Sequence, residues 1–282
     1  MKTAFEKEEK LRRIFREMKS AAIAFSGGVD STYMLAVAKE ELGENAVAVT
    51  SVSEIFPNRE RSEAEEFCEE RGIRQIRIAV KALDTPGFRE NPKDRCYLCK
   101  KAIFSKILAA AAENGLAYVA EGSNMDDMSD YRPGHRAIAE LGIRSPLREA
   151  GMYKEEIRER SKAMGLGTWD KPSFACLASR FVYGETIDEE KLSMVEKAEQ
   201  FLLDRGFKQM RVRIHGTSAR IELLPEDIVR AAQPELRTEI AKTFKQIGFS
   251  YTSLDLTGYR TGSMNEAIGQ KKEDTEAGSA AV

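Results

Sequence analysis

The sequence predicts an α/β protein with a doubly wound parallel sheet, followed by a smaller α+β domain. From residue 20 to about 180, short β-branched runs alternate with longer stretches of helical periodicity, which is the pattern of βαβ units. After about residue 180 the order changes to helix, two strands, helix and strand. A chain of 282 residues is long enough for one large domain and one small one.

The expected elements follow from this pattern in order. In the first domain, predicted as residues 1–180, they are a charged surface helix before residue 20, strands at 21–26, 46–52, 75–80 and 117–121, and helices that include 29–42 and 59–72. In the second, predicted as 181–270, they are a helix at 188–205, strands at 209–214 and 219–223, a helix at 235–247 and a strand at 251–256. Residues 271–282 carry no periodic pattern and are expected to form a flexible tail.

The composition of the chain argues against some classes of function. The chain is 42% hydrophobic and 32% charged with a net charge of -2, so global charge gives no support to nucleic-acid binding. No apolar run approaches the roughly 20 residues of a membrane span, and the first residues lack the apolar core of a signal peptide. We therefore expect a cytoplasmic protein without membrane or nucleic-acid partners, whose four cysteines are reduced thiols.

A glycine-rich segment connects the first predicted strand to the first long helix. Two glycines let a backbone approach a phosphate closely, and a helix N-terminus offers unpaired N–H groups and a favourable dipole. Hydroxyl and carboxylate groups surround the glycines. The predicted anion-binding residues are Ser26, Gly27, Gly28, Asp30, Ser31 and Thr32. Two adjacent glycines alone would equally fit a tight turn between strand and helix.

This segment resembles the loop of the PP-loop ATP pyrophosphatases, which grips pyrophosphate while a substrate oxygen attacks the α-phosphate of ATP. It is not a Walker loop, because no lysine follows the second glycine. The resemblance implies that Asp30 helps to hold magnesium, a role that suits a hard oxygen ligand.

Two further strand ends are candidate parts of the ATP site. Ser51 and Ser53, at the end of the second predicted strand, are candidates for the adenine pocket, although they also fit a simple strand terminus. The segment from Gly122 resembles a Gly-x-Asn-x-x-Asp motif of the same family, which makes Asp126 or Asp127 a candidate magnesium or ribose contact. A helix cap rich in Asn and Asp would have the same sequence.

Three cysteines from two segments form a second constellation. Cys96 and Cys99 are three residues apart at the start of a predicted helix, so both sulfurs face one way, and the helix dipole with neighbouring basic residues favours thiolates. Together with Cys176 they supply three corners of a four-iron cluster, leaving one iron open. A zinc site or a redox dithiol also fits the CxxC pair. Cys68 lies beside an apolar helix stripe and is interpreted as a small buried hydrophobe.

Over nearly its whole length, the chain is similar to the sulfur-inserting PP-loop synthases of nickel-pincer nucleotide biosynthesis, the LarE family. The similarity rests on the loop, on Cys176, and on segments at 130–134, 145–147, 154–158, 179–184, 211–215 and 260–265. It implies adenylation of the carboxylates of pyridinium-3,5-biscarboxylic acid mononucleotide, followed by sulfur transfer. Members with a single cysteine resemble sacrificial sulfur donors, whereas this chain resembles a three-cysteine type whose [4Fe-4S] cluster would carry an extra sulfide.

The resemblance assigns further residues by position. Glu199 would lie near the reactive cysteine, Arg211 and Arg213 would hold the substrate phosphate, and Lys101 and Arg180 would neutralise ATP phosphates. Arg211 and Arg213 also alternate with apolar residues as in any half-exposed strand, and Lys101 also fits a solvated surface. A phosphate site between protomers would make the protein a homo-oligomer, and the sulfur would come from sulfide or an upstream donor.

Two other functions fit parts of the pattern. A tRNA thiolase or another nucleotide-modifying synthase of this fold would use the same loop, but a tRNA enzyme should present a basic face, and this chain is slightly acidic. An ATP-binding regulatory module without chemistry would leave the three cysteines without a role.

Overall fold

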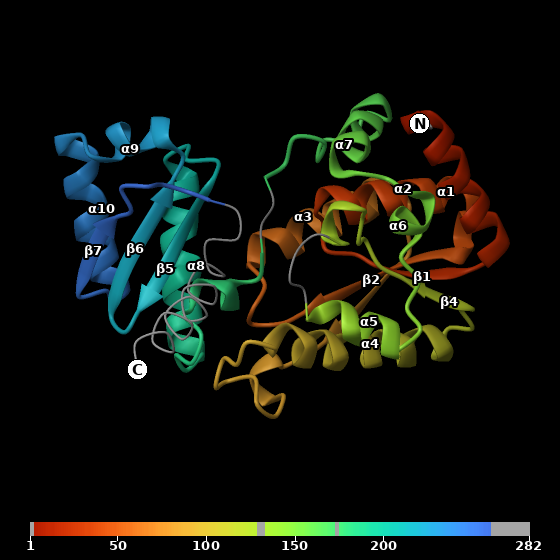
Figure 1. Ribbon diagram of the computed structural model, residues 1–282, viewed down its shortest axis with the longest axis horizontal. Helices are drawn as coiled ribbons and strands as arrows, with labels where there is room; N and C mark the ends of the chain where they lie inside the picture. The colour runs from red at the N-terminus through yellow and green to blue at the C-terminus, as the bar shows by residue number, and fades with distance from the viewer. Residues whose placement is uncertain (1–2, 129–132, 173–174, 261–282) are drawn as a thin grey trace, which may run out of the picture. The chain divides into compact units, whose positions relative to one another are not determined.

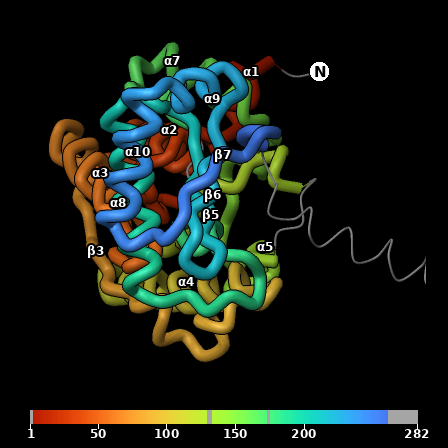
Figure 2. The backbone as a smooth tube through the Cα atoms, turned by 90° about the vertical axis from the view of Figure 1, so that its left-hand side faces the viewer, coloured from red at the N-terminus to blue at the C-terminus, as the bar shows by residue number. Residues whose placement is uncertain are grey.

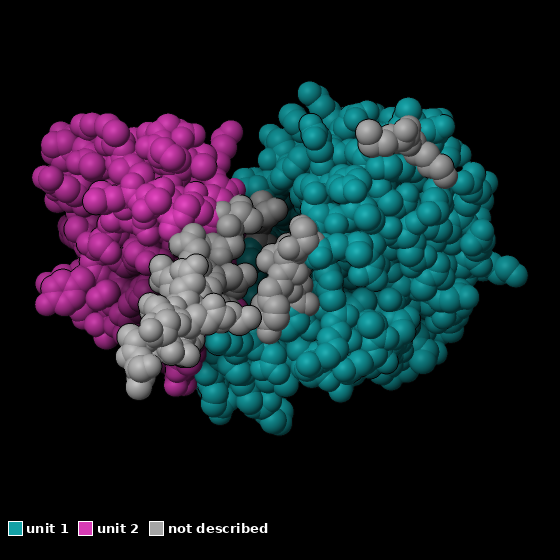
Figure 3. Space-filling model, in the orientation of Figure 1, with its two compact units in different colours: residues 1–176 teal, residues 177–282 magenta. Residues whose placement is uncertain are grey.

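A computed structural model describes residues 3–128, 133–172 and 175–260. The predicted tail at 271–282 and parts of the segments at 130–134 and 260–265 lie outside the described residues. The chain divides into two compact units, Met1–Cys176 and Leu177–Val282, which Figure 3 colours separately.

The N-terminal unit is built on a parallel sheet of four strands in the order β3-β2-β1-β4 (Figure 1). The strands are β1 (Ala21–Ala24), β2 (Ala46–Val52), β3 (Gln75–Ala79) and β4 (Tyr118–Ala120). The winding reverses beside β1, because β2 and β3 lie on one side of it and β4 lies on the other. In such sheets the carboxyl ends of the two strands at the reversal open a crevice that binds ligands. The predicted doubly wound α/β fold is confirmed.

Helices cover both faces of this sheet. In Figure 1, α1, α2 and α3 lie over one face, and α4 and α5 lie over the other. Helix α2 is buried along most of its length because it packs between the sheet and helices α1 and α7. The helices of this unit are α1 (Ala4–Met18), α2 (Val29–Leu42), α3 (Asn58–Glu70), α4 (Arg95–Glu113), α5 (Gly134–Glu140), α6 (Pro146–Ala150) and α7 (Lys154–Ala163), with short 3-10 turns η1 (Gly43–Asn45), η2 (Ala82–Asp84) and η3 (Asp126–Met128).

The C-terminal unit has the predicted α+β order. Its sheet runs β5-β6-β7, with β5 and β6 antiparallel and β6 and β7 parallel. Helices α8 and α10 pack against each other and against this sheet (Figure 2). Its elements are η4 (Leu177–Arg180), α8 (Glu189–Asp204), β5 (Met210–His215), β6 (Ser218–Leu223), α9 (Pro225–Ala231), α10 (Pro234–Ile247) and β7 (Tyr251–Leu254).

The expected strands and long helices agree with the observed ones to within a few residues, and 29–42 and 46–52 have the predicted bounds. Helices α5, α6, α7 and α9 have no counterpart among the expected elements. Among the residues that the structure describes, no helix combines the length and the apolar character needed to span a bilayer.

Candidate active site

The loop between β1 and α2 is held in place by its own groups. Gly27 has a φ of 69°, and a side chain there would lie 3.4 Å from the carbonyl oxygen of Glu60 on α3. The Ser31 hydroxyl donates to the carbonyl oxygen of Gly28 at 3.2 Å and accepts from the backbone N–H of Ser26 at 3.3 Å. Helix α2 begins here without a side-chain cap, so no capping side chain competes with an anion for its first N–H groups.

A pocket at this edge of the sheet brings the loop together with one of the predicted cysteines. It is lined by Ser26, Gly28, Val29, Asp30, Phe56, Glu60, Lys154, Lys171, Pro172 and Cys176. The other predicted loop residues, Gly27, Ser31 and Thr32, are buried and are not among those that line the pocket. The phosphate-binding loop and Cys176 therefore share one pocket within the N-terminal unit.

Asp30 and Asp126 meet at a single lysine. The ammonium group of Lys154 donates to Asp30 Oδ2 at 2.5 Å, and the backbone N–H of Lys154 donates to Asp126 Oδ2 at 2.6 Å. The Asn124 amide donates to Asp30 Oδ1 at 3.2 Å. The predicted segment after β4 therefore reaches Asp30. Asp127 instead accepts the backbone N–H of Asn124 at 2.9 Å, which is the local turn that an Asn- and Asp-rich cap predicts.

A second lysine approaches the loop from the segment before Cys176. The Lys171 ammonium donates to the carbonyl oxygen of Gly27 at 2.9 Å and to Glu63 at 2.5 Å. Arg158 on α7 holds this segment through the carbonyl oxygens of Trp169 and Lys171, at 2.6 and 2.8 Å. Neither Lys154 nor Lys171 was among the residues predicted individually for the site, although Lys154 stands in the predicted segment at 154–158.

Gly122 allows the end of β4 to approach the loop. A side chain at this position would lie 3.3 Å from the backbone nitrogen of Ser31 and 3.4 Å from the β-carbon of Asp30, which is tighter than ordinary contact. The neighbouring Glu121 is buried and accepts from the hydroxyls of Ser123 and Ser145, at 2.8 and 2.6 Å. Gly122 is therefore a packing requirement of the site.

The predicted serines at and just after the end of β2 are not among the residues that line this pocket. Ser53 donates to Glu54 at 3.0 Å, and the Ser51 hydroxyl is buried without a hydrogen-bond partner in the described part of the chain. On this side of the sheet Phe56 and Glu60 line the pocket instead. The adenine role of Ser51 and Ser53 stays a prediction.

The three cysteines lie near one another. Cys96 and Cys99 stand in the first turn of α4, and Cys99 is buried. Burial raises the pKa of the Cys99 thiol far above its ordinary value, Cys176 and Cys96 raise it further by their charge, and Lys100 opposes them. The predicted preference for thiolates at this helix end is wrong for Cys99, because burial outweighs the favourable charges. Cys68 is buried as predicted, which raises its pKa to about 12.

The two lysines that follow Cys99 differ in their surroundings. Lys101, the predicted catalytic residue, has a half-exposed side chain that donates to Tyr97 at 2.8 Å and to Glu140 at 3.2 Å. Lys100 instead lies 4.0 Å from the buried Glu121 carboxylate and opposes the raised pKa of Cys99. Of these two lysines, Lys100 is therefore the one whose charge acts on Cys99.

The remaining predicted residues form buried ion pairs in the C-terminal unit. Arg180 makes a two-pronged pair with Glu199, with both N–O distances 2.8 Å, and the backbone N–H of Val212 donates to the same carboxylate at 2.9 Å. Burial raises the pKa of Glu199, but the charge of Arg180 and these hydrogen bonds outweigh it, so the net shift is downward. Arg213 makes a similar pair with Glu222 at 3.0 and 3.1 Å.

Arg211 is buried beside this cluster. Burial and the charge of Arg180 lower the pKa of its guanidinium to about 10, and the ring of Tyr259 lies 5.1 Å from it. Arg211 and Arg213 are 5% and 8% exposed, so the half-exposed strand that the alternation also fitted does not form. A buried guanidinium whose charge is disfavoured gains from a bound anion.

The fold and the pocket together define a class of protein. A parallel sheet whose first strand leads through a Gly-Gly loop to a helix N-terminus, beside a carboxylate and two lysines, is built to bind the phosphates of a nucleotide. The chain is an ATP-dependent enzyme of the PP-loop class.

Comparison with known proteins identifies the family. No family model matches the chain. The chain is 43% identical over 262 residues to an uncharacterised protein of Synechocystis sp., a match that covers 93% of this chain and 98% of the relative. It is 35% identical over 277 residues to pyridinium-3,5-bisthiocarboxylic acid mononucleotide synthase of Lactiplantibacillus plantarum, with 95% of this chain and 97% of the relative covered. The chain therefore belongs to the LarE family that this synthase represents, as its motifs predicted.

A more distant relative matches over about half of the chain. One component of the glutamine-hydrolysing GMP synthase of Halorubrum lacusprofundi is 25% identical over 158 residues, which cover 52% of this chain and 51% of the relative. This partial match supports the assignment to the ATP-using PP-loop class.

Proposed function

We propose that the protein inserts sulfur into a nucleotide at the expense of ATP, with pyridinium-3,5-biscarboxylic acid mononucleotide as the substrate. A carboxylate oxygen of the substrate attacks the α-phosphorus of ATP, the bond to the bridging oxygen breaks, and pyrophosphate leaves. Sulfide then attacks the activated acyl carbon and displaces AMP, which leaves a thiocarboxylate. The second carboxylate reacts in the same way to give the product that names the Lactiplantibacillus relative.

The observation that carries this proposal is the shared pocket. Ser26, Gly28 and Asp30 line it from the loop, and Cys176 lines it from the end of the same unit. An activated acyl group formed at the loop would thus lie beside a sulfur-bearing residue, which shortens the path between activation and transfer. Lys171 stands against the loop and would neutralise the pyrophosphate as its charge develops.

Asp30 and Asp126 fit a magnesium ion. Magnesium is usually held by one or two carboxylates together with phosphate oxygens of the substrate. Among the described residues no group of three metal-ligating side chains is assembled, which suits an ion that arrives with its nucleotide. Magnesium bound to these carboxylates would supply positive charge to the leaving pyrophosphate.

We propose Cys96, Cys99 and Cys176 as the sulfur-delivering part of the site. Three thiols from two segments fit a [4Fe-4S] cluster in their chemistry, although the described residues hold no assembled group of three ligands. Metal binding would also account for a thiol such as Cys99, which burial keeps protonated until a metal displaces the proton. Such a cluster would supply the sulfide, which it receives as sulfide or from an upstream donor.

We propose that Arg211 and Arg213 hold the substrate phosphate, with Arg180 and Glu199 as positioning residues. The lowered pKa of Arg211 supports this, because a phosphate would stabilise its charge. A homo-oligomer in the cytoplasm, with ATP bound near Ser51, Ser53 and Gly122, completes the proposal.

Pyrophosphate release tests the first half-reaction. Wild-type protein with ATP, magnesium and the biscarboxylate mononucleotide should release pyrophosphate only when all three are present. When sulfide is also supplied, the product mass should show oxygen exchanged for sulfur. A protein that binds ATP but releases no pyrophosphate would instead be a regulatory module.

Purification without oxygen tests the cysteine assignment. Brown protein with about four irons per chain is expected. Colourless protein with stoichiometric zinc would contradict it, and so would conversion of Cys176 to dehydroalanine during turnover.

A further inference from the structure

Lys154 contacts both carboxylates that the proposed magnesium site would use. Its ammonium lies 2.5 Å from Asp30 Oδ2, and its backbone N–H lies 2.6 Å from Asp126 Oδ2. The other oxygen of Asp30 accepts the Asn124 amide. Both oxygens of Asp30 therefore already accept a hydrogen bond, and a metal ion that binds Asp30 Oδ2 would compete with the positive charge of Lys154 for that oxygen.

The backbone of Lys154 is held by its helix, whereas its side chain is partly exposed. Lys154 is the first residue of α7, and this helix is tied to α1 by Arg160 with Glu8 at 2.5 Å and by Glu156 with Lys7 at 2.6 Å. The side chains of Lys154 and Asp30 are 27% and 24% exposed, so the pair is open to solvent and pocket. A pair with this exposure is weak enough to exchange.

We propose that Lys154 is the cation that competes with a divalent metal for Asp30 and that, when the metal takes Asp30, moves to the phosphates in the same pocket. Lysine suits this exchange, because its ammonium is a compact charge on a flexible stem that binds phosphate without a fixed geometry. The metal would then bind well only with its nucleotide. This inference rests on the proposed function, since it concerns the same ATP site.

Metal binding measured without nucleotide tests whether Lys154 competes with the metal for Asp30 or only stabilises the fold. Mn²⁺ is titrated into the full-length protein, and free Mn²⁺ is followed by its electron paramagnetic resonance signal. Lys154→Met should bind Mn²⁺ about fivefold more tightly than wild type, the size expected from removing a partly exposed ion pair. The double variant Lys154→Met with Asp30→Asn should lose this gain.

Two controls keep the test sharp. Lys154→Arg keeps a cation and should bind Mn²⁺ as wild type does. Lys162→Met removes the same charge from the exposed side of the same helix, over the ring of Trp169, and should also leave Mn²⁺ binding unchanged. Circular dichroism identifies any variant that fails to fold.

Pyrophosphate supplies the second measurement. In the presence of Mn²⁺, Lys154→Met should bind pyrophosphate about tenfold more weakly than wild type, because one phosphate-binding cation is lost. Unchanged Mn²⁺ affinity in Lys154→Met, or a gain that persists without Asp30, would overturn the inference. Neither measurement uses the nucleotide substrate, so failure of the proposed sulfur transfer would leave this result readable on its own.

Discussion

One ion pair from each unit of the chain shows two different uses of oppositely charged side chains. In the N-terminal unit, Lys154 and Asp30 form a pair in which both side chains keep about a quarter of their exposure, 27% and 24%. In the C-terminal unit, the Arg180 and Glu199 side chains are 0% and 8% exposed and meet in a two-pronged geometry. A pair of the first kind exchanges partners easily, whereas a pair of the second kind is costly to break. The difference supports the proposed roles, which are chemistry at the first pair and positioning at the second.

The largest effect is expected at the buried pair. Glu199→Ala should lower the free energy of unfolding of the C-terminal unit by about 3–5 kcal/mol, because it leaves the Arg180 charge buried without its partner. Urea unfolding measures this. Lys197→Ala, exposed on the same helix, is the matched control. If Glu199→Ala and Lys197→Ala have the same free energy of unfolding, the ion pair of Arg180 and Glu199 does not stabilise this unit.

Lowering the pH should reveal how much the pair of Arg180 and Glu199 contributes to stability. The pKa of Glu199 is lowered in the folded protein, so its contribution to stability is complete above the unfolded pKa near 4.5 and is lost as the pH falls below that value. Wild-type protein should therefore lose stability in this range more steeply than Glu199→Gln. Equal slopes would contradict the lowered pKa.

The next effect is expected at the partly exposed pair of Lys154 and Asp30, and it concerns activity rather than stability. Asp30→Asn should reduce pyrophosphate release by about 100-fold, the loss typical of one electrostatic group at a transition state, with little change in stability. Asp84→Asn, an exposed carboxylate outside the pocket, should release pyrophosphate normally. Activity of Asp30→Asn within a few-fold of wild type would remove Asp30 from the proposed machinery.

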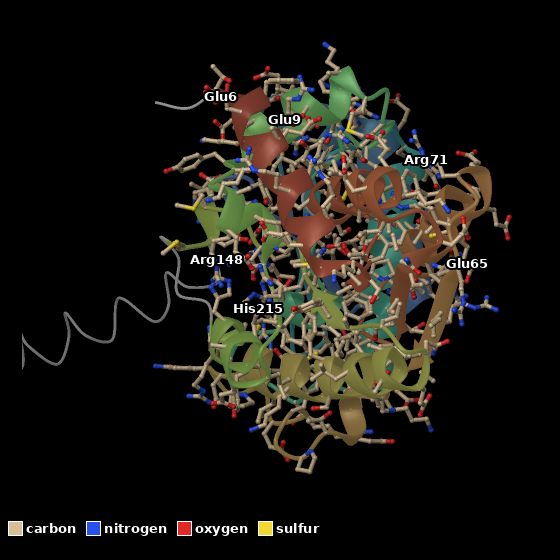
Figure 4. The ribbon with its side chains drawn as sticks, turned by 90° about the vertical axis from the view of Figure 1, so that its right-hand side faces the viewer. Glu6, Glu9, Glu65, Arg71, Arg148 and His215 are labelled. Atoms are coloured by element: carbon tan, nitrogen blue, oxygen red, sulfur yellow. The ribbon has the colours of Figure 1, made fainter. Side chains whose placement is uncertain are left out.

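A smaller effect on stability is expected at the charged cluster around Glu8, which joins α1, α2 and α7. Glu8 is 2% exposed and accepts from Tyr33 at 2.9 Å and Arg160 at 2.5 Å. Glu8→Gln should cost about 2 kcal/mol of unfolding free energy, since charge-assisted hydrogen bonds become neutral ones. Glu9→Gln is the control, because Glu9 lies on the same helix with a 42% exposed side chain (Figure 4). Similar unfolding midpoints for the two variants would show that Glu8 does not hold these helices together.

The smallest effect separates Lys100 from Lys101, the two adjacent lysines of α4. Lys101→Met should change the rate of sulfur transfer less than about twofold, because its contacts are those of a surface pair, whereas Lys100→Met should lower it about fivefold. Product formation under limiting ATP measures both. A tenfold loss in Lys101→Met would instead support its predicted catalytic role.

Local pattern predicted more of the fold than of the site. Helix 29–42 could be placed because glycines stand at both of its ends and the loop before it is distinctive. Lys154 and Lys171 could not be placed, since they are 124 and 144 residues away in sequence from the loop residues that they contact. Lysine is also common on surfaces, so only the packing of α7 and of the segment after it shows that these two face a pocket. The burial of Arg211 was missed for a related reason, because alternation along a strand does not say whether its second face is covered.

Helix α7 connects the two lysines of the pocket mechanically. Lys154 is its first residue. One turn later, Arg158 donates hydrogen bonds to the backbone segment that carries Lys171. A displacement of this helix would therefore move both positive charges together. Because Arg160 and Glu156 tie α7 to α1, the packing of this one helix sets the position of both charges near the loop.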